Sequence, residues 1–455
     1  MLHYIFIMNI SVIGLGYVGL VTAACLAELG HNVLGIDIDI NKINLLTKDR
    51  QIPIYEPGLK ELVFKNVDEG RLNYSNKIDG EIDKSVLVFL AVGTPAKEDG
   101  TPDISYIYKA IDSIVANTKT YKIFIVKSTA PIGTNLEIKK YLSKKLKTEF
   151  DVASNPEFLR EGTAVQDFMK PDRIVVGTDN IKVAEIMKDL YSSLTRNGHP
   201  ILIMDPISSE TVKYASNLML ALKVAYINEL ALLSDSIGAD IRRVREGVIS
   251  DPRIGSQFLY PSIGFGGSCL PKDVQAIEHF CKENSLNLLI PKTVLEANEK
   301  QSKWFISKIV NWFGESNIKN KTLAIWGTSF KAGTDDIRES PALRIIEGLA
   351  SKVKKLKLFD PVALSNTKKY FEGASFFNKL DFVKNENESI QGSDGLVVCT
   401  EWLQFRNPDF EKLTKELKDK VIFDGRNLYD SEKLKHHGLN HIGVGIPESK
   451  IKVMT

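Results

Sequence analysis

The stretch "VIGLGYVGL", residues 12–20, decides the fold of the N-terminal half. Gly14, Gly16 and Gly19 have the G-x-G-x-x-G spacing, directly follow an apolar strand-like run and open a helical pattern, and Asp37 closes the next predicted strand. Glycines at this spacing permit a tight turn and let a pyrophosphate reach the helix N-terminus, where N–H groups and the helix dipole favour anions. The sequence therefore predicts a dinucleotide-binding fold.

The acid at the end of the second predicted strand selects the dinucleotide. Asp37 can accept hydrogen bonds from ribose hydroxyls and would repel a 2′-phosphate, which favours NAD over NADP. Lys42 is close enough in sequence to temper that repulsion. With the intervening Tyr17 and Val18, these residues and the three glycines form the predicted cofactor site.

Apolar strand-like runs alternate with helical patterns on both sides of a long helical stretch. The alternation is typical of parallel, doubly wound sheets. The runs cover residues 9–15, 32–38, 85–93, 122–129, 150–156 and 173–178 in the first half, and 321–330, 355–361, 394–400 and 420–426 in the second. The fold class is therefore α/β, with two Rossmann-like doubly wound domains joined by a long central helix region and no repeat visible at the residue level.

We place the domain boundaries where the alternation of strand-like and helical runs gives way to a long helical stretch and where it resumes. A chain of 455 residues exceeds the roughly 250–300 at which a single core stops growing. Residues 208–240 run without proline, begin with serines and an acid, and reach their first glycine at Gly238, as a long, mostly apolar helix should. We predict an NAD-binding domain over 1–207, a central helical domain for dimerisation and the catalytic loop over 208–313, and a C-terminal nucleotide-sugar-binding domain over 314–455.

Composition excludes several function classes. The chain is 43% hydrophobic and 25% charged with a net charge of +2, which argues against nucleic acid as a partner held by bulk electrostatics. No apolar run approaches the roughly 20 residues of a membrane helix. Residues 1–7 are too short for a signal peptide and could precede a true start at Met8. We expect a cytoplasmic protein without a membrane partner.

One of the four cysteines stands apart from the others. Cys25 and Cys399 read as small core residues, and Cys281 as helical. Their spacing suggests neither a disulfide framework nor a metal site. Cys269 lies in "GFGGSCLPKD", residues 264–273. Glycines help a loop whose backbone must bend unusually or lie close to a ligand.

A thiol in such a loop suggests nucleophilic chemistry. Lys272 or Lys213 could stabilise the Cys269 thiolate, and Lys213 and Asn217 share one helix face at i,i+4, where they can hold an oxyanion. A nucleophilic cysteine is useful when an aldehyde must be oxidised again through a thiohemiacetal and a thioester. The residues therefore indicate oxidation of an alcohol to a carboxylate, with four electrons passing to two NAD. Glu161 and Asp273 are candidates for positioning the hydrolytic water.

The chain resembles the UDP-glucose/GDP-mannose dehydrogenase family from Met8 to about residue 445. The resemblance depends on motifs in a fixed order: "GLGYVGL", "YEPGL", "FLAVGTPAKEDGTPD", "KSTAPIGT", "NPEFLREGTA", "KYASNLMLALKVAYINEL", "DPRIG", "GFGGSCLPKD", "FKAGTDDIRESP" and "FDGRNLYD". It implies an NAD domain, a central dimerisation region and a C-terminal domain that closes over a nucleotide sugar, in a homodimer.

The resemblance also implies roles for particular residues. Cys269 would form the thioester, Lys213 and Asn217 would stabilise the oxyanion, and Lys213 would take part in proton transfer in the first oxidation. Asp273 and Thr129 would orient water, and Glu161 would serve as acid and base, supported by Glu157 one helical turn earlier. The remaining substrate contacts would be Phe158, Leu159, Arg160, Phe258, Tyr260, Ser262, Gly266, Lys331, Arg426 and, across the dimer interface, Arg253. The further cofactor contacts would be Thr94, Thr129, Glu161, Lys272 and Arg338.

The substrate implied by the resemblance is UDP-glucose, oxidised to UDP-glucuronate. "SCLPKD" and "FKAGTDD" also resemble GDP-mannose dehydrogenases, whereas "DPRIG", "FLYPSIGFGG" and "FDGRNLYD" resemble the UDP-glucose branch. A UDP-N-acetylhexosamine 6-dehydrogenase is a weaker alternative. A two-electron hydroxyacid dehydrogenase, in which Cys269 is structural, and a non-catalytic NAD-binding protein are the rival classes.

Overall fold

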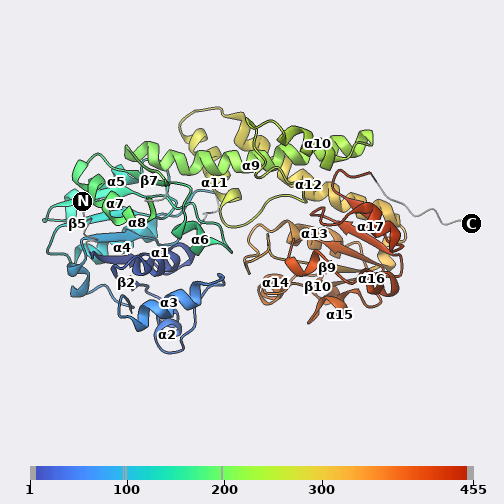
Figure 1. Cartoon of the computed structure of the whole chain (residues 1–455), viewed down its shortest axis with the longest axis horizontal. Helices are drawn as coiled ribbons and strands as arrows, with labels where there is room; N and C mark the ends of the chain where they lie inside the picture. Colours follow the sequence, from blue (N-terminus) through green and yellow to red (C-terminus); the bar gives the residue numbers. More distant parts are fainter. Residues whose placement is uncertain (1–6, 96, 98–99, 196–197, 448–455) are drawn as a thin grey trace, which may run out of the picture. The chain divides into compact units, whose positions relative to one another are not determined.

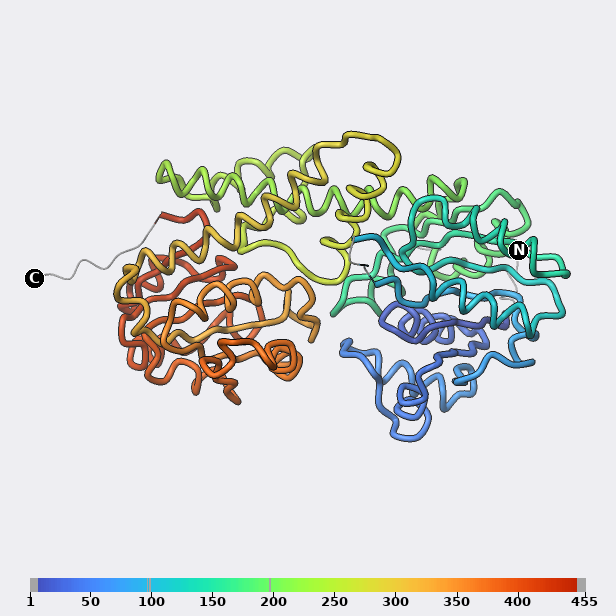
Figure 2. Tube along the Cα trace, turned by 180° about the vertical axis from the view of Figure 1, so that it is seen from behind, coloured from blue at the N-terminus to red at the C-terminus, as the bar shows by residue number. Residues whose placement is uncertain are grey.

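The computed structural model describes residues 7–95, 97, 100–195 and 198–447, so the predicted extension at the N-terminus and part of the 89–103 motif lie outside the described residues. The chain divides into two compact units, residues 1–216 and 217–455, drawn in Figures 1 and 2. Each unit contains one sheet flanked by helices. The predicted α/β class is confirmed, and each unit is described by itself below.

The first unit contains an eight-stranded sheet in the order β3-β2-β1-β4-β5-β6-β7-β8. All neighbours are parallel except β6 and β7, which pair antiparallel between Ser154 and Gly177. This one antiparallel step departs from the expected all-parallel sheet. The strands are β1 (Asn9–Ile13), β2 (Asn32–Ile36), β3 (Leu72–Ser75), β4 (Leu87–Leu90), β5 (Lys122–Val126), β6 (Phe150–Ser154), β7 (Ile174–Gly177) and β8 (Ile201–Met204).

Helices cover both faces of this sheet because its central strands are apolar on both sides. Along β4, Leu87 and Phe89 join one buried cluster while Val88 and Leu90 join the other. On the first face α1 packs against α3 and α6 (Figure 1). The helices are α1 (Tyr17–Glu28), α2 (Ile40–Thr47), α3 (Leu59–Asp68), α4 (Ser105–Val115), α5 (Thr134–Lys145), α6 (Ala164–Met169), α7 (Ile181–Leu190) and α8 (Ser192–Thr195).

The second unit contains a parallel six-stranded sheet in the order β11-β10-β9-β12-β13-β14. Its strands are β9 (Thr322–Trp326), β10 (Lys355–Phe359), β11 (Leu380–Phe382), β12 (Gly395–Val398), β13 (Val421–Asp424) and β14 (Asn440–Gly443). The helices that follow α9 are α10 (Ile241–Ile249), α11 (Leu270–Glu283), α12 (Leu289–Phe313), α13 (Pro341–Ala350), α14 (Leu364–Phe371), α15 (Glu386–Ile390), α16 (Phe410–Glu416) and α17 (Ser431–His436).

The two sheets repeat one hydrogen-bond pattern at their carboxyl edges. In the first sheet Gly14 N donates to Ile36 O at 2.7 Å and Leu15 N donates to Asp37 Oδ2 at 2.8 Å. In the second sheet Gly327 N donates to Phe359 O at 2.8 Å and Thr328 N donates to Asp360 Oδ2 at 2.7 Å. The repeat that was not visible in the sequence is therefore present in the hydrogen bonds at the ends of these strands.

Helix α9 (Pro206–Ile237) passes from the first unit into the second and confirms the predicted long helix. By length and composition alone it is apolar enough to cross a membrane, contrary to the expectation that no segment is. The same test is passed by core helices of soluble proteins. Ile227 and Ala231 of α9 belong to one buried cluster with Phe305 and Ile309 of α12, alongside which α9 runs in Figure 2.

Candidate active site

The glycine loop after β1 has the shape that a dinucleotide requires. Gly14 has φ +91°, and a Cβ there would lie 2.8 Å from the Cα of Val92. A Cβ on Gly19 would lie 1.7 Å from the carbonyl oxygen of Gly14, so α1 could not approach the loop with any other residue. At Gly16, by contrast, nothing lies within 4 Å of a built Cβ, and no side chain caps α1. The loop therefore leaves open space beside the helix N-terminus, which fits a pyrophosphate.

The predicted ribose acceptor is in place at the end of β2. Asp37 is buried, and its Oδ1 accepts from the N–H of Asp39 at 2.9 Å. Lys42 Nζ lies 3.1 Å from Asp37 Oδ2, which confirms that this lysine stands beside the acid. A carboxylate has about four acceptor positions, so Asp37 keeps capacity for ribose hydroxyls.

Hydrogen bonds join the loops that follow β4 and β5 at the carboxyl ends of these strands. The Thr94 hydroxyl donates to the carbonyl of Thr129 at 2.8 Å, and Ser128 Oγ donates to Val92 O at 2.6 Å. The predicted cofactor contacts Thr94 and Thr129 are thus in direct contact. Their role towards the cofactor stays a prediction.

A buried ion pair joins two of the predicted site residues of the first unit. Lys213 Nζ lies 2.8 Å from Glu157 Oε1, and both side chains are buried. Burial alone would raise the pKa of Glu157, but Lys213 and the N–H of Leu159 outweigh it and hold this pKa below its ordinary value. The Phe158 ring lies beside the pair, with Lys213 Nζ 5.6 Å from its centroid. Glu157 is therefore an ionised partner of Lys213.

A second buried lysine, missed from the sequence, lies near this pair. Lys127 Nζ donates to Asn155 Oδ1 at 3.1 Å, and Asn155 lies in the same loop as Glu157. Burial lowers the pKa of Lys127 to about 8; Glu157 counteracts this and Lys213 adds to it. The "KSTAPIGT" motif contained this residue, but nothing in the sequence separates a buried lysine from an exposed one.

The segment that carries Glu157 and Glu161 is an irregular loop, so the expected helical turn between them is wrong. Asn155 anchors its start by donating to Val175 O at 2.8 Å, which fixes the backbone without helical bonds. Glu161 is half-buried. Arg160 is exposed and its Nη2 lies 2.5 Å from Asp167 Oδ1.

In the second unit, the glycines of the cysteine loop make room for neighbouring segments of the chain. A Cβ on Gly266 would lie 2.2 Å from the carbonyl oxygen of Glu339, and one on Gly267 would lie 2.8 Å from the Phe330 ring. The N–H of Gly267 donates to Arg338 O at 2.9 Å. The loop thus lies directly against residues 330–341 of the same unit. This close contact within the chain explains the glycines without a ligand.

Cys269 stands at the N-terminus of α11, where it is the N-cap residue. The thiol is partly exposed, whereas Cys25 and Cys399 are buried as predicted, and Cys281, predicted to be helical, lies in α11 and is buried as well. The Ser268 hydroxyl lies 3.5 Å from Cys269 Sγ. A helix N-terminus stabilises negative charge, so this position favours a thiolate nucleophile.

A hydrogen bond joins Asn217 and Asp273 one helical turn from Cys269. Asn217 Nδ2 donates to Asp273 Oδ2 at 2.6 Å, and both side chains are buried. Lys272 Nζ lies 3.5 Å from Asp273 Oδ1. Asp273 is one turn after Cys269 in α11, and its N–H donates to Cys269 O at 2.9 Å. Three predicted catalytic residues therefore share one small region of the second unit.

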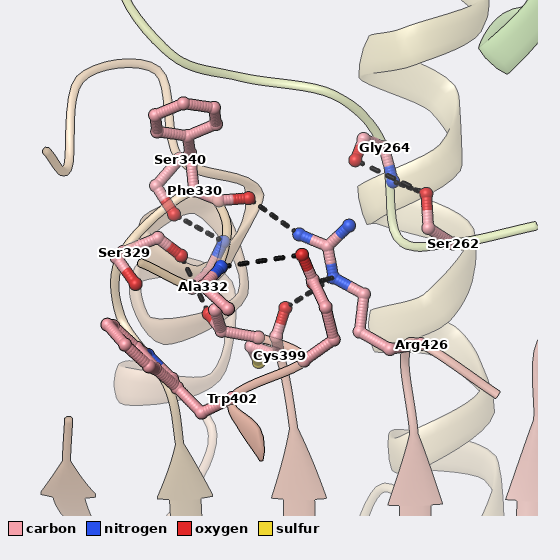
Figure 3. Close-up of polar contacts among 12 residues, drawn as sticks. Ser262, Gly264, Ser329, Phe330, Ala332, Ser340, Cys399, Trp402 and Arg426 are labelled. Carbon is pink, nitrogen blue, oxygen red and sulfur yellow. Dashed lines mark hydrogen bonds and ion pairs between the residues drawn. The ribbon is translucent and has the colours of Figure 1, made fainter. Parts of the chain in front are cut away.

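Arg426 follows β13 and is held by backbone carbonyls at the edge of the sheet (Figure 3). Its Nε donates to Cys399 O at 2.7 Å and its Nη2 to Phe330 O at 2.8 Å, and Glu401 Oε2 lies 3.2 Å from Nε. Lys331 follows Phe330 directly. The two predicted C-terminal substrate contacts are thus linked through Phe330.

The segment before the cysteine loop passes close to Arg426, as Figure 3 shows for Ser262 and Gly264. Ile263 N donates to Gly425 O at 3.0 Å. Ser262 is buried and its N–H donates to Asn228 Oδ1 at 2.8 Å. Amide side chains of α9 and α12 therefore fix this segment.

The other predicted contacts in the second unit lie on more open surface. Phe258 has φ +64°, which is unusual for a bulky residue. Tyr260 is exposed beneath the Arg245 guanidinium, which lies 4.5 Å from its ring centroid. Arg253 is 87% exposed and pairs with Asp251 at 2.5 Å. Arg338 is exposed and its Nη2 lies 2.7 Å from Asp336 Oδ2.

No group of histidine, cysteine and acidic side chains that could hold a metal ion occurs among residues 7–95, 97, 100–195 and 198–447. The equivalent acid of the second sheet, Asp360, has its acceptor positions filled by six donors within the chain: the N–H groups of Thr328, Ser329, Val362 and Ala363, the Ser329 hydroxyl and Trp402 Nε1. The dinucleotide loop with open space is in the first unit. The glycine loop and Asp37 define a dinucleotide-binding protein.

Comparison with known proteins shows the family. Models of the UDP-glucose/GDP-mannose dehydrogenase family match the chain over residues 8–195 (NAD binding domain), 207–300 (central domain) and 324–431 (UDP binding domain). The UDP-glucose 6-dehydrogenase of Rhizobium meliloti is 38% identical over 97% of this chain and 100% of that protein. The enzyme of that name from Rickettsia bellii is 39% identical over 96% of this chain and 99% of its own.

Solved structures agree with this result. A UDP-glucose dehydrogenase from Pyrobaculum islandicum has a TM-score of 0.88 and 33% identity, covering 98% of this chain and 99% of its own. A UDP-D-ManNAc dehydrogenase from Pyrococcus horikoshii has a TM-score of 0.83 and 26% identity, covering 96% and 99%. The chain belongs to the UDP-glucose/GDP-mannose dehydrogenase family. It is an NAD-dependent nucleotide-sugar dehydrogenase, and the predicted cofactor is confirmed.

Proposed function

We propose that this protein oxidises UDP-glucose to UDP-glucuronate in two NAD-dependent steps through a covalent intermediate on Cys269. The observation that carries the proposal is the partly exposed thiol at the N-terminus of α11, beside the buried Asp273–Asn217 pair. A two-electron dehydrogenase would have no use for a nucleophile at this place. The curated relatives named above act on UDP-glucose, which favours this sugar.

In the first oxidation the C6 hydroxyl of the sugar loses a proton and a hydride. We assign the proton transfer to Lys213, which would accept the hydroxyl proton as a neutral amine; Glu157, 2.8 Å away, would balance the charge of the ammonium that results. Gly14, Gly16, Gly19 and Asp37 would hold NAD, which would supply the hydride acceptor for each of the two oxidations. The product of this step is an aldehyde.

In the second oxidation the Cys269 thiolate forms a C–S bond to the aldehyde carbon, giving a thiohemiacetal. Loss of a second hydride leaves a thioester. Lys213 and Asn217, which are i,i+4 on α9, would stabilise the oxyanion of these intermediates. Water then attacks the thioester, the C–S bond breaks, and the thiolate is regenerated with the carboxylate product. Asp273 and Thr129 would orient this water, and Glu161 would accept its proton.

The remaining assignments belong to the same proposal. Phe158, Leu159, Arg160 and Glu157 would line the sugar, and Phe258, Tyr260, Ser262, Gly266, Lys331 and Arg426 would hold the nucleotide diphosphate. Arg253 would reach a substrate held by a second copy. Thr94, Glu161, Lys272 and Arg338 would complete the cofactor site. The proposed domains are 1–207, 208–313 and 314–455.

We further infer a cytoplasmic homodimer. Met219, Tyr226 and Leu233 recur every seven residues on α9 and are 56%, 47% and 53% exposed. An apolar stripe with this spacing is suited to pairing with the same helix of a second copy. Sedimentation velocity of the wild type and of Leu233→Glu tests the dimer: the wild type should sediment as a dimer and the variant as a monomer.

A panel of UDP- and GDP-sugars with NAD tests the reaction and the substrate together. UDP-glucose should give two NADH for each sugar consumed, and GDP-mannose and UDP-N-acetylhexosamines should turn over much more slowly. One NADH per sugar would contradict the covalent route. Faster turnover of another nucleotide sugar would reassign the substrate.

A further inference from the structure

Glu56 connects three separate segments of the first unit, and no role is assigned to it above. It belongs to the "YEPGL" segment between α2 and α3 and is only 4% exposed. Its Oε2 accepts a hydrogen bond from the Tyr17 hydroxyl and one from the N–H of Gly162 at 2.6 Å. Its Oε1 accepts from the N–H of Ala164 at 2.7 Å. Both oxygens of this buried carboxylate are therefore engaged.

The partners of Glu56 lie next to two functional segments of this unit, the glycine loop of the cofactor site and the loop that carries Glu161. Tyr17 directly follows Gly16 of the cofactor loop and is the first residue of α1. Gly162 directly follows Glu161, and with φ +84° it turns the chain into α6. The Tyr17 hydroxyl also accepts from the N–H of Gly162 at 3.2 Å. The cofactor loop and the Glu161 loop thus meet at one carboxylate.

The electrostatics of Tyr17 show that Glu161 lies near this junction. Burial raises the pKa of Tyr17 most, and the hydrogen bond to Glu56 and the negative charges of Glu56 and Glu161 raise it further. The tyrosine therefore stays a neutral donor. A neutral hydroxyl can bridge the buried Glu56 carboxylate and the backbone beside Glu161.

We propose that Glu56 is a positioning residue that fixes the Glu161 carboxylate relative to the bound dinucleotide. The proposal depends on the acid–base role of Glu161 proposed above. Hydrogen bonds from N–H groups to a carboxylate are among the stronger ones, and the carboxylate here accepts two of them next to Glu161. Glutamine cannot replace it, because its amide NH₂ would face an N–H donor. A small displacement of a catalytic group is expensive, at about a hundredfold in rate for about 1 Å.

The test compares Glu56→Gln with Glu61→Gln, an exposed glutamate five residues along the chain in α3. Hydrogen exchange of the peptide spanning residues 159–168 should be faster in Glu56→Gln, by about tenfold at Gly162 and Ala164, and unchanged in Glu61→Gln. This readout needs no turnover, so it decides the contact even if the proposed reaction is wrong. Unchanged exchange in Glu56→Gln would overturn the proposal.

A double-mutant cycle with Glu161→Gln tests the positioning role. Glu56→Gln should lower kcat by about tenfold to a hundredfold in the wild-type background and have little further effect when Glu161 is already glutamine. An equal loss in both backgrounds would show a merely structural role and overturn the proposal. If Glu56→Gln does not fold, Tyr17→Phe, which keeps both backbone hydrogen bonds to Glu56, should give a smaller loss of kcat with the same dependence on Glu161.

Discussion

The Nζ of Lys213 lies 2.8 Å from Oε1 of Glu157, with 5% and 4% of the two side chains exposed. The pair is buried, so each charge depends on the other for its solvation. Removing one partner leaves an uncompensated charge in the interior, which is far more costly than breaking a surface pair.

Glu157→Gln should therefore destabilise the folded chain by about 3 kcal/mol or more. Glu185, which pairs with Lys188 at 2.7 Å on the surface, provides the matched control. Glu185→Gln should change the free energy of unfolding by less than about 1 kcal/mol. Urea denaturation followed by circular dichroism measures both, and similar losses for the two variants would show that burial of the pair is unimportant.

Lys127 should give the stability of the first unit a distinctive pH dependence. Its pKa of about 8 in the folded chain lies below the ordinary value of 10.5. Between these values the unfolded chain binds more protons than the folded chain, so this lysine makes stability rise with pH across that window. Below pH 8 the buried charge of Lys127 lowers the free energy of unfolding by its full amount, which is about 3 kcal/mol.

Lys127→Met should consequently be more stable than the wild type near pH 7, and the difference should disappear as the pH approaches about 10. Asn155 Oδ1 keeps the hydrogen bond from the Tyr191 hydroxyl at 2.7 Å in this variant. The measurement is the urea midpoint at several pH values, with exposed Lys139→Met as the control. Parallel pH profiles for Lys127→Met and the wild type would contradict the assignment.

The contact between the cysteine loop and residues 330–341 can be tested by adding one methyl group. A Cβ on Gly266 would lie 2.2 Å from Glu339 O, a backbone atom that cannot move aside without shifting its segment. Gly266→Ala should cost about 1–3 kcal/mol in stability and lower kcat. Gly247→Ala is the control, since nothing lies within 4 Å of a Cβ there. Wild-type activity in Gly266→Ala would mean that the loop is not held as described.

The Asn217–Asp273 pair should matter for chemistry rather than for cofactor binding. Asn217→Asp would place a second carboxylate where an amide now donates at 2.6 Å. Two buried like charges at that separation repel strongly, so one would take up a proton or move away. We expect kcat to fall by at least about a hundredfold, with the Kd for NAD, measured by calorimetry, within about threefold of the wild type. A parallel loss of NAD affinity would place the pair in the cofactor site instead.

Much of the fold was predictable because the central strands are apolar on both faces and are separated by helical periodicity. The strands missed from the sequence, β3, β8, β11 and β14, are only partly buried, whereas the equally short β4, β7, β12 and β13 are buried at every position. Burial at every position favours the continuous apolar run that marks a strand, and a partly buried strand need not show one. The likeness of the two sheets was also hidden. It lies in equivalent hydrogen bonds at Gly14 and Gly327, which join residues far apart in the sequence.

Part of the candidate site could not be predicted, because burial and contacts are set by the tertiary fold. Glu56 and Lys127 both lie in recognised motifs, but their partners Gly162 and Asn155 are far along the chain. The glycines beside Cys269 suggested a ligand, whereas the structure places them against other residues of the same unit. The long helix was correctly predicted from the sequence, since a single helix needs only its own residues.

The most direct test of the central claim is mass spectrometry of the enzyme quenched with acid during turnover of UDP-glucose and NAD. The account predicts a sugar-nucleotide adduct on the peptide that contains Cys269, released by hydroxylamine, and none on the peptide that contains Cys281. Cys269→Ala should form neither adduct nor acid while binding NAD normally. Acid production by Cys269→Ala at the wild-type rate, or an adduct on another residue, would contradict the account.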